Sequence, residues 1–90
     1  MLYINKMKIS QSIGENLKKA RKQKGYTQAV LANKMGILQP AYARYESGKI
    51  ELNYEQVKQL CVLLDITPNF LWGFEDEYGD PTFNSFVHIK

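Results

Sequence analysis

Residues 39–44 gather side chains that can make paired hydrogen bonds and apolar contacts with a planar partner. The carboxamide of Gln39 can form two parallel hydrogen bonds with an adenine edge, and the guanidinium of Arg44 can do the same with guanine. Pro40 and Ala41 carry no polar side-chain atoms and could touch the methyl group of thymine. If one helix face presents these four side chains together, that face could read the edges of nucleobases.

Three polar side chains near this segment could hold phosphate. Ser47 and Lys49 follow it directly, and both can donate hydrogen bonds. Gln28 stands one residue after Thr27, at a predicted helix start, where free backbone N–H groups and the helix dipole favour an anion. Gln28, Ser47 and Lys49 are therefore candidate phosphate contacts.

Catalytic and metal-binding chemistry has little support. The sequence holds one cysteine, Cys61, and one histidine, His88, which cannot form an internal disulfide or a zinc site of four protein ligands. Cys61 lies in an apolar helical stripe and is expected to be a small core residue, and His88 lies close to the end of the chain. There is no Gly-rich phosphate loop. We expect no enzyme activity, no metal and no cofactor.

The length and composition predict one small globular domain. The chain has 90 residues, of which 44% are hydrophobic and 23% are charged. No apolar run approaches the roughly 18 to 20 residues that cross a bilayer, and residues 1–10 lack the apolar core of a signal peptide. We expect a cytoplasmic protein without a membrane span.

The net charge of +3 is unevenly distributed. Residues 1–50 sum to +8, whereas residues 51–90 sum to −5. A polyanionic partner would explain a basic half beside an acidic half, and so would an ordinary solvated lysine face. Charge alone does not choose between them.

Local start and stop signals predict five short helices. Ser12 and Glu15 have the spacing of a capping box, so we expect the first helix to begin near Ser12. Thr27, Asn53 and Thr67 are predicted caps of later helices. With their caps, the expected helices cover residues 12–24, 27–36, 40–48, 53–64 and 67–73.

The predicted helices divide the chain into three parts. We expect an N-terminal arm over residues 1–11, a helical domain over 12–74, and an acidic connector with a C-terminal tail over 75–90. Leu2–Ile9 and Thr82–Ile89 are rich in aromatic and branched residues with partial alternation, which favours short strands or arms.

The segment from Thr27 to Lys49 has the spacing of a helix-turn-helix. That motif needs a small residue between its helices, a residue of positive φ in its turn, and apolar anchors on the inner face of its second helix. Ala32 and Gly36 meet the first two needs, and Tyr42 with Tyr45 meets the third. An inward Tyr42 and Tyr45 turn Pro40, Ala41 and Arg44 outward, with Gln39 at the leading end.

From Ile13 to Gly73 the sequence resembles the lambda-repressor-like helix-turn-helix family, which includes phage repressors, Cro proteins and many bacterial regulators. The matching positions are Leu17, Arg21, Gly25, Thr27, Gln28, Leu31, Ala32, Gly36, Glu46, Gly48, Leu60, Leu71, Trp72 and Gly73. The resemblance implies an all-α, five-helix DNA-binding domain whose third helix lies in the major groove. It also implies a phosphate contact at Gln28 and a buried structural ion pair between Arg21 and Glu46.

Three positions depart from the family pattern. Val30 stands where members often carry a glutamate that completes a capping box with the preceding threonine. Leu38 replaces a small polar residue before the third helix, which affects the cap of that helix. Tyr42 is bulkier than the usual aliphatic anchor, which affects the tilt of the helix in the groove.

These observations predict a sequence-specific regulator of transcription that binds double-stranded DNA, acting as a repressor on a palindromic operator. One helix-turn-helix reads few base pairs, so we expect a homodimer on half-sites about 34 Å apart. Trp72 and Phe74 are the expected dimer contacts, because Phe70 and Leu71 are needed to close the core. The alternative is an antitoxin that binds a protein toxin as well as operator DNA, through the aromatic tails and Val30.

Overall fold

The computed structural model describes residues 9–76 and 78–81, and this part of the chain is all-α, as predicted. It contains α1 (Ile9–Lys24), α2 (Gln28–Met35), α3 (Gln39–Glu46), α4 (Tyr54–Leu64) and α5 (Pro68–Trp72). After α5, Glu75 and Pro81 pair in an isolated antiparallel bridge.

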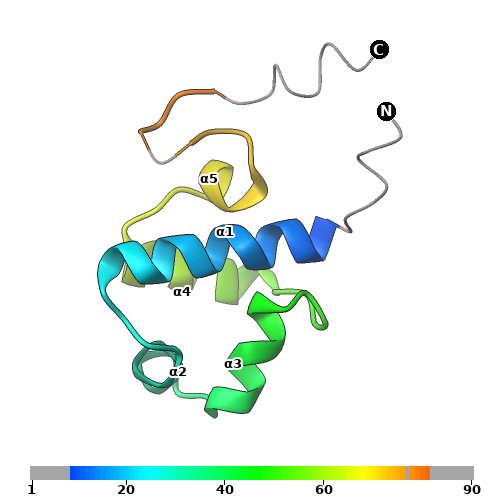
Figure 1. The fold of residues 1–90 in the computed structure, drawn as a ribbon, viewed down its shortest axis with the longest axis vertical. Coiled ribbons are helices and arrows are strands. Elements are labelled where there is room, and N and C mark those ends of the chain that lie inside the picture. Colours follow the sequence, from blue (N-terminus) through cyan, green and yellow to red (C-terminus); the bar gives the residue numbers. More distant parts are fainter. Residues whose placement is uncertain (1–8, 77, 82–90) are drawn as a thin grey trace.

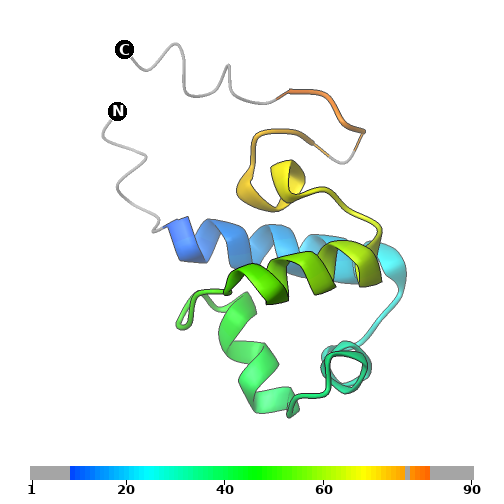
Figure 2. The ribbon, with the colours of Figure 1, turned by 180° about the vertical axis from the view of Figure 1, so that it is seen from behind.

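The long helix α1 is the centre of the arrangement. α3 and α2 lie on one side of it and α5 lies on the other (Figure 1). The view from behind shows α4 alongside α1, running in the same direction (Figure 2). α3 therefore stands at the end of the molecule opposite α5, with its N-terminal end next to α2 (Figure 1).

The core joins all five helices. Its fully buried large side chains come from each of them: Leu17, Leu31, Tyr42, Leu60 and Leu71. Cys61 is only partly buried, and that burial raises the pKa of its thiol. The thiol is therefore held in its protonated, less reactive form.

Three predicted helix starts are confirmed by their caps. The Thr27 hydroxyl accepts from the Val30 N–H at 3.1 Å, and the Thr67 hydroxyl accepts from the Phe70 N–H at 3.0 Å. Asn53 and Gln56 form a reciprocal capping box at the start of α4. Each cap satisfies backbone donors that a helix leaves free.

The predicted start of the first helix at Ser12 is wrong. Ser12 lies inside α1, which already includes Ile9. The extra turn is held from outside the helix, because the Ser10 hydroxyl donates to the Gly48 carbonyl at 3.0 Å. Ile9, which was expected to end a strand, is thus helical, and the rest of the expected strands, residues 2–8 and 82–89, lies outside the described residues.

Candidate nucleic-acid interface

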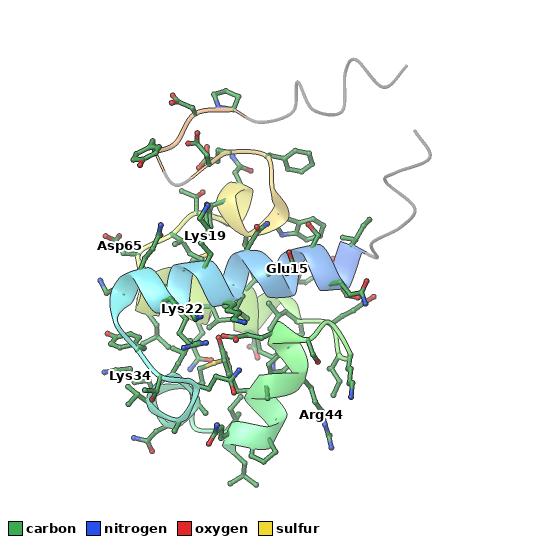
Figure 3. The ribbon with its side chains drawn as sticks, viewed as in Figure 1. Glu15, Lys19, Lys22, Lys34, Arg44 and Asp65 are labelled. Carbon is green, nitrogen blue, oxygen red and sulfur yellow. The ribbon has the colours of Figure 1, made fainter. Side chains whose placement is uncertain are left out.

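The third helix has an exposed face and a buried face, as the spacing predicts. Tyr42 and Glu46 are buried against the domain, whereas Gln39, Pro40 and Arg44 are exposed. Figure 3 shows Arg44 projecting from α3 away from the other helices. Ala41 is half-buried, so it offers less of its surface than its neighbours.

The turn between α2 and α3 is short and fixed by hydrogen bonds. Gly36 has φ 74°, a left-handed conformation that glycine adopts without strain. The Ile37 N–H then donates to the Ala32 carbonyl at 3.0 Å, and Ala32 itself is buried. This pattern ends α2 and redirects the chain into α3 within three residues.

A buried ion pair joins α1 to the end of α3. Arg21 Nε lies 2.6 Å from Glu46 Oε2, and Arg21 Nη2 lies 3.2 Å from Glu46 Oε1. The remaining nitrogen, Nη1, donates to the Tyr26 carbonyl at 2.8 Å. The structure thus contains the ion pair that the family resemblance implies, with the two-pronged geometry that suits a guanidinium and a carboxylate.

Two more donors reach the same carboxylate. The Tyr42 hydroxyl donates to Glu46 Oε2, and Gln28 Nε2 donates to Glu46 Oε1 at 3.0 Å. Burial alone would raise the pKa of Glu46, but hydrogen bonds from Arg21, Tyr42 and Gln28 outweigh it and lower that pKa. Burial, followed by the bond to Glu46, raises the pKa of Tyr42. One carboxylate therefore connects α1, α2 and α3.

The Tyr42 and Gln28 bonds to Glu46 were not anticipated from the sequence. Tyr42 precedes Glu46 by four residues on one helix, a spacing at which side chains meet, and a buried tyrosine needs a partner for its hydroxyl. That signal was available. Gln28 is 18 residues away from Glu46 along the chain, and no local spacing brings the two together.

The three candidate phosphate contacts differ in their exposure and in whether their hydrogen-bond donors are already used within the protein. Lys49 is exposed directly after α3. Gln28 is half-buried and uses one amide hydrogen on Glu46, which leaves the second for another acceptor. Ser47 is exposed, but its hydroxyl donates to the Arg44 carbonyl at 3.2 Å, a bond that a phosphate contact would have to replace.

Gly14 is a positioning residue that was not expected from the sequence. A Cβ atom added there would lie 2.3 Å from the Glu46 carbonyl oxygen and 2.7 Å from that of Tyr45. α1 and the end of α3 can therefore approach this closely only where α1 has no side chain. A glycine inside a helical pattern was the available signal.

The surface around α3 is basic. Within residues 16–50, all of which are described, the acidic residue is Glu46, and it is buried in the ion pair. The same range exposes Lys18, Lys19, Lys22, Lys24, Lys34, Arg44 and Lys49. Not all of these face the same way, because Lys19 projects from the side of α1 nearer α5 (Figure 3). Lys34 lies on α2, with its ammonium 5.2 Å from the centre of the Tyr26 ring.

The predicted dimer residues lie at and just after the end of α5, which is on the opposite side of α1 from α2 and α3 (Figure 1). Trp72 ends α5 with 48% of its surface exposed, and Phe74 follows with 47% exposed. Phe70 and Leu71 are buried in the core, as expected.

Among the helices of the described residues, none is both long and apolar enough to cross a membrane.

Comparison with known proteins finds helix-turn-helix proteins. Residues 17–71 match the family model described as helix-turn-helix. The HTH-type transcriptional regulator YqaE of Bacillus subtilis (strain 168) is 46% identical over 57 residues, which are 63% of this chain and 49% of YqaE. The SPbeta prophage-derived HTH-type transcriptional regulator YonR of the same strain is 40% identical over 58 residues, 64% of this chain and 54% of YonR. The matches thus span about half the length of these relatives.

A solved structure has the same fold. The clp gene regulator ClgR from C. glutamicum superimposes with a TM-score of 0.67 at 22% identity, over 72% of this chain and 84% of that one. The family model covers more than half of the chain, within the region of the helices just described. The chain therefore belongs to the lambda-repressor-like, XRE-type helix-turn-helix family of DNA-binding transcription regulators.

Proposed function

We propose that the protein binds double-stranded DNA sequence-specifically, with α3 in the major groove, and represses transcription from a palindromic operator in the cytoplasm. The observation that carries this proposal is the outer face of α3. It exposes Gln39, Pro40 and Arg44 on a helix whose inner face is locked by the Glu46 hydrogen bonds. A rigid helix with free bidentate donors and acceptors suits the reading of base edges.

Base reading and phosphate binding are assigned to different side chains. Gln39 and Arg44 pair with bases, and Pro40 with Ala41 makes apolar contacts. Gln28, Ser47 and Lys49 bind the phosphates on either side of the groove. The lysines and arginine exposed by residues 16–50 support this arrangement, because no carboxylate within that range is exposed.

Two copies of the chain bind together. The exposed Trp72 and Phe74 support a homodimer through the region of α5, which leaves α3 of each copy free for a half-site. Sedimentation of the full chain tests this assembly: a Trp72→Ala, Phe74→Ala double variant should be monomeric at a concentration where the parent is a dimer. A double variant as dimeric as the parent would overturn this choice of surface.

A genome-wide footprint of bound DNA tests the main proposal. We expect a two-fold symmetric site with half-sites about one helical turn apart. A reporter fused to a footprinted promoter should be repressed by the parent and released by a Gln39→Ala, Arg44→Ala double variant. Binding without sequence preference would contradict the proposal, and stable co-purification of a second small protein would favour the antitoxin interpretation instead.

A further inference from the structure

Leu38 is a large apolar side chain held out in solvent at the tip of α3. It is 77% exposed, the highest value among the large hydrophobic residues of α2, α3 and the turn between them. It occupies the N-cap position of α3, yet it makes no side-chain hydrogen bond to the helix. Serine, threonine, asparagine or aspartate at this position would stabilise the helix start. Leu38 therefore contributes neither burial nor a cap to the fold.

The backbone around Leu38 is nevertheless fixed. Its carbonyl accepts hydrogen bonds from the Ala41 N–H at 3.0 Å and from the Tyr42 N–H at 3.1 Å. Tyr42 is fully buried and bonded to Glu46. The exposed side chain is therefore attached to an ordered point at the leading end of α3, beside Gln39 and Pro40.

The chemistry of the major groove limits what a leucine can recognise there. Base edges present hydrogen-bond donors and acceptors, which gain nothing from an isobutyl group, and one apolar group, the C5-methyl of thymine. Resting on the proposed function, we propose that Leu38, adjoining Pro40, packs against a thymine methyl in each half-site. Leu38 is thus a specificity-determining residue. It recognises a thymine methyl, whereas Gln39 and Arg44 form hydrogen bonds with bases.

Uracil in place of thymine tests this contact, because it removes the methyl group and keeps the base pairing. Duplexes of the footprinted operator carry uracil at one symmetric pair of positions at a time, and affinity is measured by fluorescence anisotropy. At one pair of positions the parent should bind the thymine duplex about fourfold more tightly per half-site, the change that burial of one methyl group corresponds to. Leu38→Ala should bind both duplexes equally.

Two further variants separate recognition from stability. Leu38→Ser adds the missing cap, so its melting temperature should rise while its thymine preference is lost. Val62, on α4, is similarly exposed at 75%, and Val62→Ala should keep the full thymine preference. A Leu38→Ala protein with the parent's thymine preference, or a parent indifferent to uracil at every position, would overturn the Leu38 contact alone. Failure of the parent to prefer any operator would instead overturn the proposed function with it.

Discussion

The two faces of α3 have opposite properties. The inner face carries Tyr42 and Glu46, which are buried and joined by hydrogen bonds to Arg21 and Gln28 on two other helices. The outer face carries Gln39 and Arg44, which are exposed. Eight residues therefore hold both a buried carboxylate with three hydrogen-bond partners and exposed side chains that a partner can reach.

The residues that position this helix are therefore separate from those that can recognise a partner. Changes on the inner face should alter the free energy of unfolding, because they disturb packing and buried charge. Changes on the outer face should alter binding and leave folding almost unchanged. Each variant below tests whether this separation holds.

Glu46→Ala should have the largest effect. It leaves the buried Arg21 guanidinium without its partner and leaves the Tyr42 hydroxyl and Gln28 amide without an acceptor. Removing one member of a buried pair costs about 3 to 5 kcal/mol, a large part of the free energy of unfolding of a domain of this size. Thermal and urea unfolding followed by circular dichroism measure the loss.

Arg44→Ala is the matched control for that measurement, since it removes a charge two residues away on the opposite face. It should melt like the parent. If Glu46→Ala also melted like the parent and lost only DNA binding, Glu46 would belong to the interface and the separation of the two faces would fail.

Gly14→Ala should be the next most disruptive change. The new Cβ atom would lie 2.3 Å from the Glu46 carbonyl oxygen, so α1 and α3 must move apart. Overpacking of this kind costs about 1 to 3 kcal/mol, more than the higher helix propensity of alanine returns. Chemical denaturation measures the cost.

The neighbour Glu15 provides the comparison for this variant, because Glu15→Ala changes an exposed side chain in the same turn of α1. It should unfold within about 0.5 kcal/mol of the parent. A Gly14→Ala protein as stable as the parent would show that α1 and α3 can separate at no cost to admit a Cβ atom, despite the distance of 2.3 Å between that atom and the Glu46 carbonyl oxygen.

Arg44→Ala should weaken binding to the operator by about 1 to 3 kcal/mol and relax the preference at one base pair. The reason is the loss of a bidentate contact to guanine, while the helix stays in place. Anisotropy titrations on the operator and on a scrambled duplex measure the two affinities. An equal loss on both duplexes would remove Arg44 from base reading.

Lys49→Ala, just beyond the end of α3, is the contrasting variant. A phosphate contact carries no sequence information, so its loss should weaken both duplexes alike. The slope of log affinity against log salt should fall by about one unit. A sequence-dependent loss at Lys49 would exchange the roles proposed for these two residues.

The fold was largely predictable because its determinants are local. The sequence predicts helix starts at Thr27, Asn53 and Thr67, and the side chains of these residues cap those helices in the structure. The same local rule misled at Ser12, where a capping-box pattern lies inside α1. The tertiary contact of Ser10 with Gly48 decides that boundary, and no local pattern encodes it.

The candidate site was predictable only in outline. Helical periodicity placed Gln39, Pro40 and Arg44 on the exposed face of α3. It could not show that Gln28 already uses one amide hydrogen on Glu46 or that the Ser47 hydroxyl is bonded to Arg44. The Gln28 bond depends on how closely α2 and α3 pack, whereas the Ser47 bond is one of several local hydrogen bonds open to a serine at the end of a helix.

Tyr42→Phe should have the smallest effect, because it removes one hydrogen bond of the inner face. The pKa of Glu46 is lower in the folded protein than its ordinary value of about 4.3. Ionised Glu46 therefore stabilises the fold above that pH, and this stabilisation is lost as the pH falls through the lower, folded pKa. Without the Tyr42 hydroxyl, the folded pKa should move back toward 4.3. The fall in the free energy of unfolding between pH 7 and pH 3 should then shrink by about 1 kcal/mol or less.

Tyr54→Phe is the matched control, because it removes the same hydroxyl from a side chain that is 92% exposed. Urea denaturation across this pH range should give the same pH dependence for Tyr54→Phe as for the parent. If Tyr42→Phe also followed the parent, the Tyr42 hydroxyl would not stabilise the carboxylate. Arg21 and Gln28 alone would then hold the inner face of α3, and the bulk of Tyr42, not its hydroxyl, would set the position of the helix.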